Sequence, residues 1–224
     1  QHPYSKMINS ILLTLILPHY DKNDIEEEID EMKLLANTIG YDIKHSFKQN
    51  RLALDPATYF GKGKIKEIFE KANLLKINTI FINDDIKPNH YKNIKKLSKD
   101  NIEIIDRTCL ILNIFSNNAK TNESKSQVRL ATLQYMMPRL TGMWTHLERQ
   151  MGGVGTRGGP GEKQIEIDRR LIRKSIDKLK KELKTIQTQH NNQIKNRENI
   201  FKIALAGYTN SGKSTLLKKI TGYD

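Results

Sequence analysis

The stretch MGGVGTRGGPG, residues 151–161, places six of the chain's 13 glycines within eleven residues. A turn between two helices needs only about 2–8 residues, and a single glycine would serve it. Backbone with few Cβ atoms can lie close against a crowded surface such as RNA, with Arg157 as a charged contact. The alternative is a flexible linker, because glycine-rich segments are commonly flexible. The sequence on either side of this stretch favours the contact interpretation.

Helical patterns flank the glycine-rich stretch on both sides. Over residues 162–197, apolar side chains recur with the seven-residue period of a coiled coil, at Ile165, Ile172, Ile176, Leu179, Leu183 and Ile186. Over residues 124–149, apolar side chains recur at steps of three and four, and Pro138 and Gly142 are expected to kink this helix. Two helices with apolar stripes predict an antiparallel helical hairpin, with residues 151–161 as its tip.

The net charge of +13 is concentrated in this predicted hairpin. Residues 1–117 carry a net charge of +1, residues 118–198 carry +9, and residues 199–224 carry +3. A basic segment of this kind is typical of a polyphosphate partner, nucleic acid first. General lysine use in an AT-rich genome is the alternative, but it would also make the first half of the chain basic. Six arginines surround the glycines: Arg139, Arg149, Arg157, Arg169, Arg170 and Arg173.

We therefore expect an RNA-contact surface at the hairpin tip and its flanks. The predicted contact residues are Arg149, Gly152, Gly153, Gly155, Arg157, Gly158, Arg169, Arg170 and Arg173.

The residues before the hairpin alternate between short apolar runs and amphipathic helical patterns. This alternation predicts a small parallel α/β subdomain, joined by right-handed crossovers. The expected strands are residues 10–17, 41–47, 79–82 and 102–105, and the expected helices are residues 24–39, 61–75 and 88–97, with a further helix from near Thr108.

The residues after the hairpin contain a phosphate-binding motif. An apolar strand is expected over residues 201–206, followed by GYTNSGKST, which has the form G-x-x-x-x-G-K-[ST] and leads into a helical pattern. In this motif successive backbone N–H groups surround the phosphates, and the helix N-terminus adds its positive end. Lys213 would reach the β- and γ-phosphates, and the Ser214 hydroxyl would ligate Mg²⁺. The predicted nucleotide-binding residues are Gly207, Tyr208, Thr209, Asn210, Ser211, Gly212, Lys213, Ser214 and Thr215.

Only nine residues follow this motif. A nucleotide domain of this type also needs an aspartate for magnesium, a base-reading segment and further strands. We therefore expect residues 199–224 to be the beginning of such a domain. We assign no catalytic residue and expect this chain alone to hydrolyse little nucleotide.

Several other classes of protein are not supported by the sequence. The longest apolar run, residues 11–17, is far shorter than the ~20 residues of a membrane span, and the absence of a leader favours a cytoplasmic protein. The single Cys109 excludes an internal disulfide framework and is expected in the core. The six histidines lack metal-ligand spacing. Residues 55–64 are interpreted as a turn and a helix start, with a weak anion site as the alternative.

Together these motifs resemble the HflX family of ribosome-associated GTPases from about Leu52 to the end of the chain, and one departure is the second glycine of Gly158-Gly159. The motifs that carry the resemblance are residues 61–64, 138–140, 144–150, 152–157, 161–162, 168–170 and 207–215. The resemblance implies an α/β subdomain, a helical hairpin and a GTPase domain that binds GTP and Mg²⁺. It also implies binding to the large ribosomal subunit, with the tip towards the peptidyl-transferase region, and a role in splitting or rescuing stalled ribosomes.

We accordingly expect three parts: residues 1–118, the α/β subdomain; residues 119–198, the basic hairpin; and residues 199–224, the start of a GTPase domain. The leading hypothesis is a monomeric GTPase whose nucleotide state controls how the hairpin contacts ribosomal RNA. The first alternative is a non-catalytic RNA- or ribosome-binding module. The second is a coiled-coil ATPase that acts on DNA or on a protein.

Overall fold

The computed structural model describes residues 7–98, 102–140, 162–195, 204–207 and 212–222. The chain divides into two compact units, Gln1–Leu183 and Lys184–Asp224. The three-part division expected from the sequence stays a prediction.

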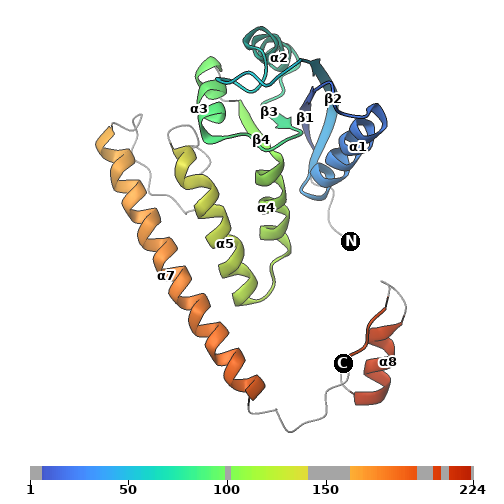
Figure 1. Ribbon diagram of the computed structural model, residues 1–224, viewed down its shortest axis with the longest axis vertical. Coiled ribbons are helices and arrows are strands. Elements are labelled where there is room, and N and C mark those ends of the chain that lie inside the picture. The colour runs from blue at the N-terminus through green and yellow to red at the C-terminus, as the bar shows by residue number, and fades with distance from the viewer. Residues whose placement is uncertain (1–6, 99–101, 141–161, 196–203, 208–211, 223–224) are drawn as a thin grey trace. The chain divides into compact units, whose positions relative to one another are not determined.

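A four-stranded parallel sheet organises the first unit (Figure 1). Its strands are β1 (Ile8–Ile16), β2 (Tyr41–Asn50), β3 (Thr79–Ile82) and β4 (Glu103–Asp106), in the order β2-β1-β3-β4. The pairing of β1 with β2 shifts register between Ser10 and Ile11, whereas the pairing of β3 with β4 is regular. The parallel α/β class expected from the sequence is confirmed.

Helices cover both faces of this sheet. They are α1 (Lys22–Thr38), α2 (Lys62–Leu74), α3 (Pro88–Leu97) and α4 (Arg107–Asn118). Successive side chains of a strand point to opposite faces, so in β1 Ile11 and Leu13 pack with α2 and α3 while Leu12 packs with α1 and α4. This placement buries the strands on both sides and explains their nearly continuous apolar sequence. Cys109 lies in the second of these clusters, as expected, and burial raises the pKa of its thiol to about 12.

Two further helices pack beside one another in this unit, the second of them with its part up to Leu183 (Figure 1). The first is α5 (Asn122–Met136), followed by the 3-10 turn η1 (Met137–Arg139), and the second is α7 (Glu162–Lys195). Ser126, early in α5, donates a hydrogen bond to Glu182, late in α7, at 3.3 Å. Met136, at the end of α5, shares a core cluster with Ile172, early in α7. The two helices therefore run antiparallel, as predicted.

The seven-residue pattern of α7 has the predicted structural role. Ile172, Ile176 and Leu179 are buried in the cluster that also contains Leu133 and Met136 of α5. We call the buried set Ile172, Ile176 and Leu179 the α7 seam.

The helical pattern is interrupted at Pro138, where a kink was expected: α5 ends at Met136, η1 follows, and Leu140 is helical again. Proline lacks a backbone N–H and crowds the carbonyl one turn earlier. The second expected kink, at Gly142, lies outside the described residues. One local prediction needs correction. Residues 204–207 form no strand, although one was expected over residues 201–206. A strand is stabilised by hydrogen bonds to a neighbouring strand, and within the described ranges no strand pairs with residues 204–207.

The α7 seam generates a test of the helical packing. Ile176 is 6% exposed, so Ile176→Ala should lower the free energy of unfolding by about 2–5 kcal/mol through lost burial and a cavity. Ile167, on the same helix, is 41% exposed, so Ile167→Ala should change it by about 0.5 kcal/mol or less. Urea unfolding followed by the helical circular dichroism signal measures both values. Equal losses in the two variants would show that the seam does not anchor α7.

Candidate nucleotide and RNA-contact sites

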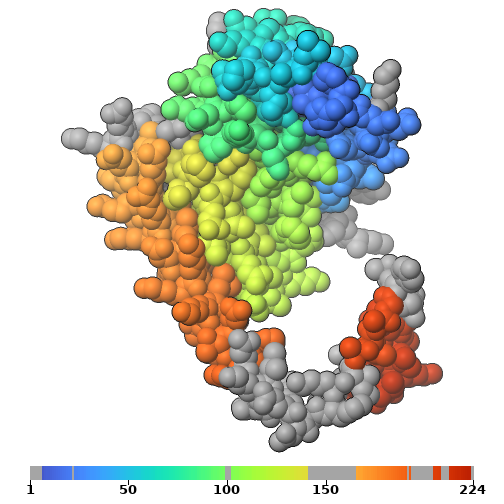
Figure 2. All heavy atoms as spheres, in the orientation of Figure 1, coloured from blue at the N-terminus to red at the C-terminus, as the bar shows by residue number. Residues whose placement is uncertain are grey.

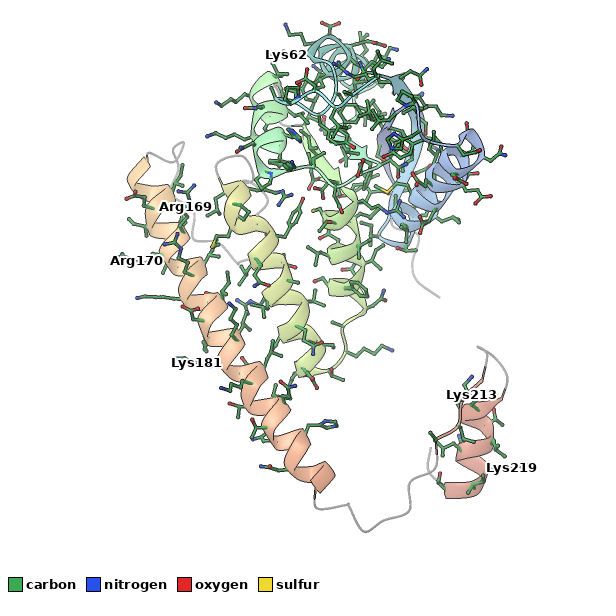
Figure 3. All side chains as sticks on the ribbon, in the orientation of Figure 1. Lys62, Arg169, Arg170, Lys181, Lys213 and Lys219 are labelled. Carbon is green, nitrogen blue, oxygen red and sulfur yellow. The ribbon has the colours of Figure 1, made fainter. Side chains whose placement is uncertain are left out.

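The two ends of the phosphate-binding motif are joined by its lysine. Lys213 begins helix α8 (Lys213–Thr221), and its Nζ donates a hydrogen bond to the carbonyl oxygen of Gly207 at 2.7 Å. The positive end of this side chain therefore lies beside Gly207, the first residue of the motif. Figure 3 labels Lys213 and Lys219 at opposite ends of α8. The predicted residues Tyr208, Thr209, Asn210 and Ser211 lie outside the described residues.

Gly212 is required at the point where the loop becomes a helix. Its φ is +80°, in the left-handed region, and nothing lies within 4 Å of the position that a Cβ atom would occupy. The need for glycine is therefore torsional and not steric, because an L side chain in this conformation costs roughly 1–2 kcal/mol.

The N-terminus of α8 has the electrostatics of an anion site. It lacks a side-chain cap and has no acidic residue in its first turn, while Lys218 and Lys219 lie in its last turn. The positive end of the helix dipole is therefore not offset by a carboxylate within this helix. Ser214 and Thr215 are exposed on the first turn, where their hydroxyls are accessible to a ligand.

The arginines predicted to contact RNA fall into two groups. Arg149, Gly152, Gly153, Gly155, Arg157 and Gly158 lie outside the described residues. Arg169, Arg170 and Arg173 lie on the first half of α7, where Arg169 is half-buried and the other two are exposed. Figure 3 labels Arg169 and Arg170 there and Lys181 further along the helix. The structure therefore brings three of the predicted residues onto one helix.

The exposed part of α7 carries positive charge that the fold does not neutralise. Within the described part of the chain, six exposed basic side chains of this helix have no ion-pair partner: Arg170, Arg173, Lys174, Lys178, Lys180 and Lys184. We call these six residues the α7 basic face. In Figure 2 the side chains of the first half of α7 project from the molecule on the side away from α5.

Some basic residues of the α/β subdomain form ion pairs. Lys48 pairs with Glu26, Arg107 pairs with Glu31, and Lys64 and Lys71 both pair with Glu67. Other exposed lysines of this subdomain, such as Lys62, Lys66 and Lys87, have no ion-pair partner among the described residues. The hairpin segment therefore differs from this subdomain in its net charge, +9 against +1, and not in the presence of unpaired cations.

Arg139 does not belong to the predicted tip cluster. Its side chain is 9% exposed, and its guanidinium donates to the carbonyl oxygens of Tyr135 at 2.9 Å and Ile86 at 2.6 Å. Its Cζ also lies 3.9 Å from the centre of the Tyr135 ring. Arg139 can be buried because these carbonyl oxygens accept hydrogen bonds from its guanidinium. The spacing of the sequence gave no sign of these partners.

A buried carboxylate accompanies Arg139. Asp106 is 1% exposed, and its Oδ1 accepts hydrogen bonds from the Cys109 amide at 2.9 Å and the Tyr135 hydroxyl at 2.7 Å. Arg139 Nη2 lies 3.7 Å from Asp106 Oδ2. Burial raises the pKa of Asp106, against the opposing effect of these donors and of Arg139. The motif at residues 138–140 includes Arg139, but nothing in the sequence pointed to its place beside Asp106.

Residues 55–64 form the turn and helix start expected from the sequence. The Asp55 carboxylate accepts hydrogen bonds from the amides of Ala57 at 2.9 Å and Thr58 at 3.0 Å, and the bond from Thr58 is the main cause of its lowered pKa. The Gly61 amide, next to α2, donates to Gln49 Oε1 at 3.0 Å. This amide is therefore already engaged by the protein.

The described residues lack two kinds of feature. Among them, no three His, Cys, Asp or Glu side chains come together in a way that could hold a metal ion. None of the described helices combines the length and apolar character of a membrane span.

Comparisons with known proteins agree with the sequence motifs. Models of the N-terminal region and the middle region of GTP-binding GTPases match residues 26–116 and 118–197. The protein named GTPase HflX of Magnetococcus marinus is 42% identical over 95% of this chain and 49% of its own length. The protein of the same name from Flavobacterium psychrophilum is 42% identical over 94% of this chain and 50% of its own length.

The fold of this chain is also similar to that of a solved GTP-binding protein. The crystal structure of a GTP-binding protein from the archaeon Sulfolobus solfataricus in complex with GDP is 27% identical to this chain, with a TM-score of 0.54. The match covers 96% of this chain and 54% of that protein. The chain spans about half the length of the curated relatives it matches.

Proposed function

The chain belongs to the HflX family of GTPases, of which it contains the N-terminal and middle regions, and from this membership we propose that the intact protein hydrolyses GTP and acts on the large ribosomal subunit. The observation that carries the nucleotide part is the loop closed by Lys213 on the Gly207 carbonyl, next to the left-handed Gly212. This arrangement presents a lysine and an uncapped helix N-terminus to the same anion.

The residues at the start of α8 fit a nucleotide with Mg²⁺. The Lys213 ammonium would exchange its bond to Gly207 for oxygens of the β- and γ-phosphates, which carry more negative charge than a carbonyl. The exposed hydroxyl of Ser214 would hold Mg²⁺, which needs few protein ligands because the phosphates and water supply the others. Mg²⁺ would offset the charge of the phosphates when it is bound.

The α7 basic face supports a ribosomal RNA partner. The six cations of this face, which have no ion-pair partner among the described residues, attract a polyanion through long-range electrostatics, and RNA is the polyanion of the ribosome. In this proposal the tip, residues 151–161, makes the close contact with ribosomal RNA, while Arg169, Arg170 and Arg173 bind phosphates nearby. Because phosphate contacts fix register without reading sequence, the tip would supply the selectivity.

The proposal joins the two sites in one cycle. The nucleotide bound at residues 207–215 would decide how firmly the hairpin engages the large subunit, and this engagement would split or rescue ribosomes. The protein would act in the cytoplasm as a monomer, where it meets both GTP and ribosomes.

The Lys213 side chain provides the first test. In the intact protein Lys213→Ala should lower GTP affinity by about 10- to 100-fold, the effect of losing hydrogen bonds to a charged partner. Lys219→Ala removes the same charge from the other end of α8 and should change the affinity less than about twofold. Titration with a fluorescent GTP analogue measures both variants.

Equal GTP affinities for the two variants would contradict the assignment of Lys213. Competition by ATP as strong as that by GTP would instead favour the ATPase alternative.

The tip provides the second test. Replacing Gly152, Gly153 and Gly155 together by alanine keeps the charge but adds Cβ atoms and disfavours positive φ. If the tip docks closely, co-sedimentation with large subunits at fixed salt should fall by about tenfold. Arg157→Ala should also lower binding more than Lys184→Ala, which removes a charge in the middle of α7.

Nonspecific electrostatics would give a different pattern. In that case the triple alanine variant would bind as well as the wild type, and the two single charge variants would lose equal affinity. Both results together would leave the tip as a linker.

A further inference from the structure

The Asp106 and Arg139 cluster connects three segments that are distant in sequence. Asp106 ends β4 and caps α4 through the Cys109 amide. Tyr135, near the end of α5, donates its hydroxyl to the same carboxylate oxygen. Arg139 of η1 reaches the Ile86 carbonyl in the loop before α3. These bonds tie the end of α5 to the carboxyl edge of the sheet.

The polar groups of this cluster are incompletely satisfied. Asp106 Oδ2 and Arg139 Nε are both buried and have no hydrogen-bond partner within the described structure. Buried charges with missing hydrogen bonds are costly, and apolar side chains of similar size often stabilise a fold equally well or better. Stability alone is therefore a poor explanation for a buried arginine and aspartate at this position.

Geometry offers a better explanation. A guanidinium is planar and rigid, and its donors point in fixed directions. Arg139 stacks on the Tyr135 ring and reaches two carbonyls and one carboxylate, so η1 has few positions that satisfy all of them. An apolar side chain would allow η1 to slide or rotate. In the sequence, η1 lies between α5 and the predicted tip, residues 151–161.

We propose that Arg139 is a positioning residue that, through Asp106 and Tyr135, holds the α5 and α7 pair at a fixed angle to the α/β subdomain. This inference rests on the proposed function only in its last step, in which the fixed angle lets the tip reach its ribosomal RNA contact. The angle itself is a property of the chain without any partner.

A distance measurement tests the fixed angle directly. Spin labels are placed in the intact protein at the exposed positions Glu27 of α1 and Lys180 of α7, with each residue replaced by cysteine. The native Cys109 is buried and stays unlabelled. Arg139→Lys keeps the charge but removes the planar fork, whereas Arg129→Lys is the matched change at an exposed position of α5.

The wild type and Arg129→Lys should give one narrow distance distribution, and Arg139→Lys should broaden it about twofold. Tyr135→Phe, which removes one hydroxyl, should broaden it less. Thermal unfolding of each variant shows that the measured sample is folded. A distribution for folded Arg139→Lys as narrow as that of the wild type would overturn the proposal.

A second measurement tests the link to the tip. Affinity for large ribosomal subunits should fall about tenfold in Arg139→Lys, a common size of coupling between two sites, with GTP affinity unchanged. A broadened distance with full subunit affinity would overturn this link. If the wild type itself does not bind large subunits, the proposed function fails, and the distance measurement still decides whether Arg139 is a positioning residue.

Discussion

The hydrogen bonds to the buried carboxylate of Asp106 join the two halves of the first unit. One oxygen accepts the amide that begins α4 and the hydroxyl of Tyr135 from α5. A carboxylate that is 1% exposed needs donors, so α5 is restricted to positions that bring Tyr135 to it. The α7 seam packs in turn with residues of α5. These contacts bury the seam side of α7. The opposite side, which carries the α7 basic face, is therefore exposed.

The local structure was largely predictable from sequence because it depends on local periodicity. The strands of the sheet and the helices α1 to α4 lie within a few residues of their expected positions, and Ile172, Ile176 and Leu179 are buried as their seven-residue spacing predicts. Arg139 shows where such reasoning fails. Its sequence neighbours suggested a place among the tip arginines, but its partners Asp106 and Ile86 are more than 30 residues away. Nothing in the local pattern distinguishes a buried arginine from an exposed one.

The candidate sites were predictable to different degrees, because some of their features depend on local sequence and others on contacts between distant residues. The phosphate-binding motif has a fixed spacing, so the roles proposed for Gly212 and Lys213 could be predicted from the sequence alone. The strand expected before the motif depends instead on hydrogen bonds to neighbouring strands, and residues 204–207 do not form a strand in the structure. The basic character of α7 was visible in the sequence, but which of its cations lie exposed was not. In the α/β subdomain some lysines, such as Lys48 and Lys71, are paired with glutamates, and only the folded structure shows these pairs.

The central claim is that the nucleotide at the phosphate-binding loop controls the engagement of the hairpin with the large ribosomal subunit. The most direct test is the affinity of the intact protein for large subunits with a non-hydrolysable GTP analogue and with GDP, at the same salt concentration. The account predicts binding about tenfold tighter with the GTP analogue, within the usual range of coupling between two sites. Equal affinity in the two nucleotide states would contradict it.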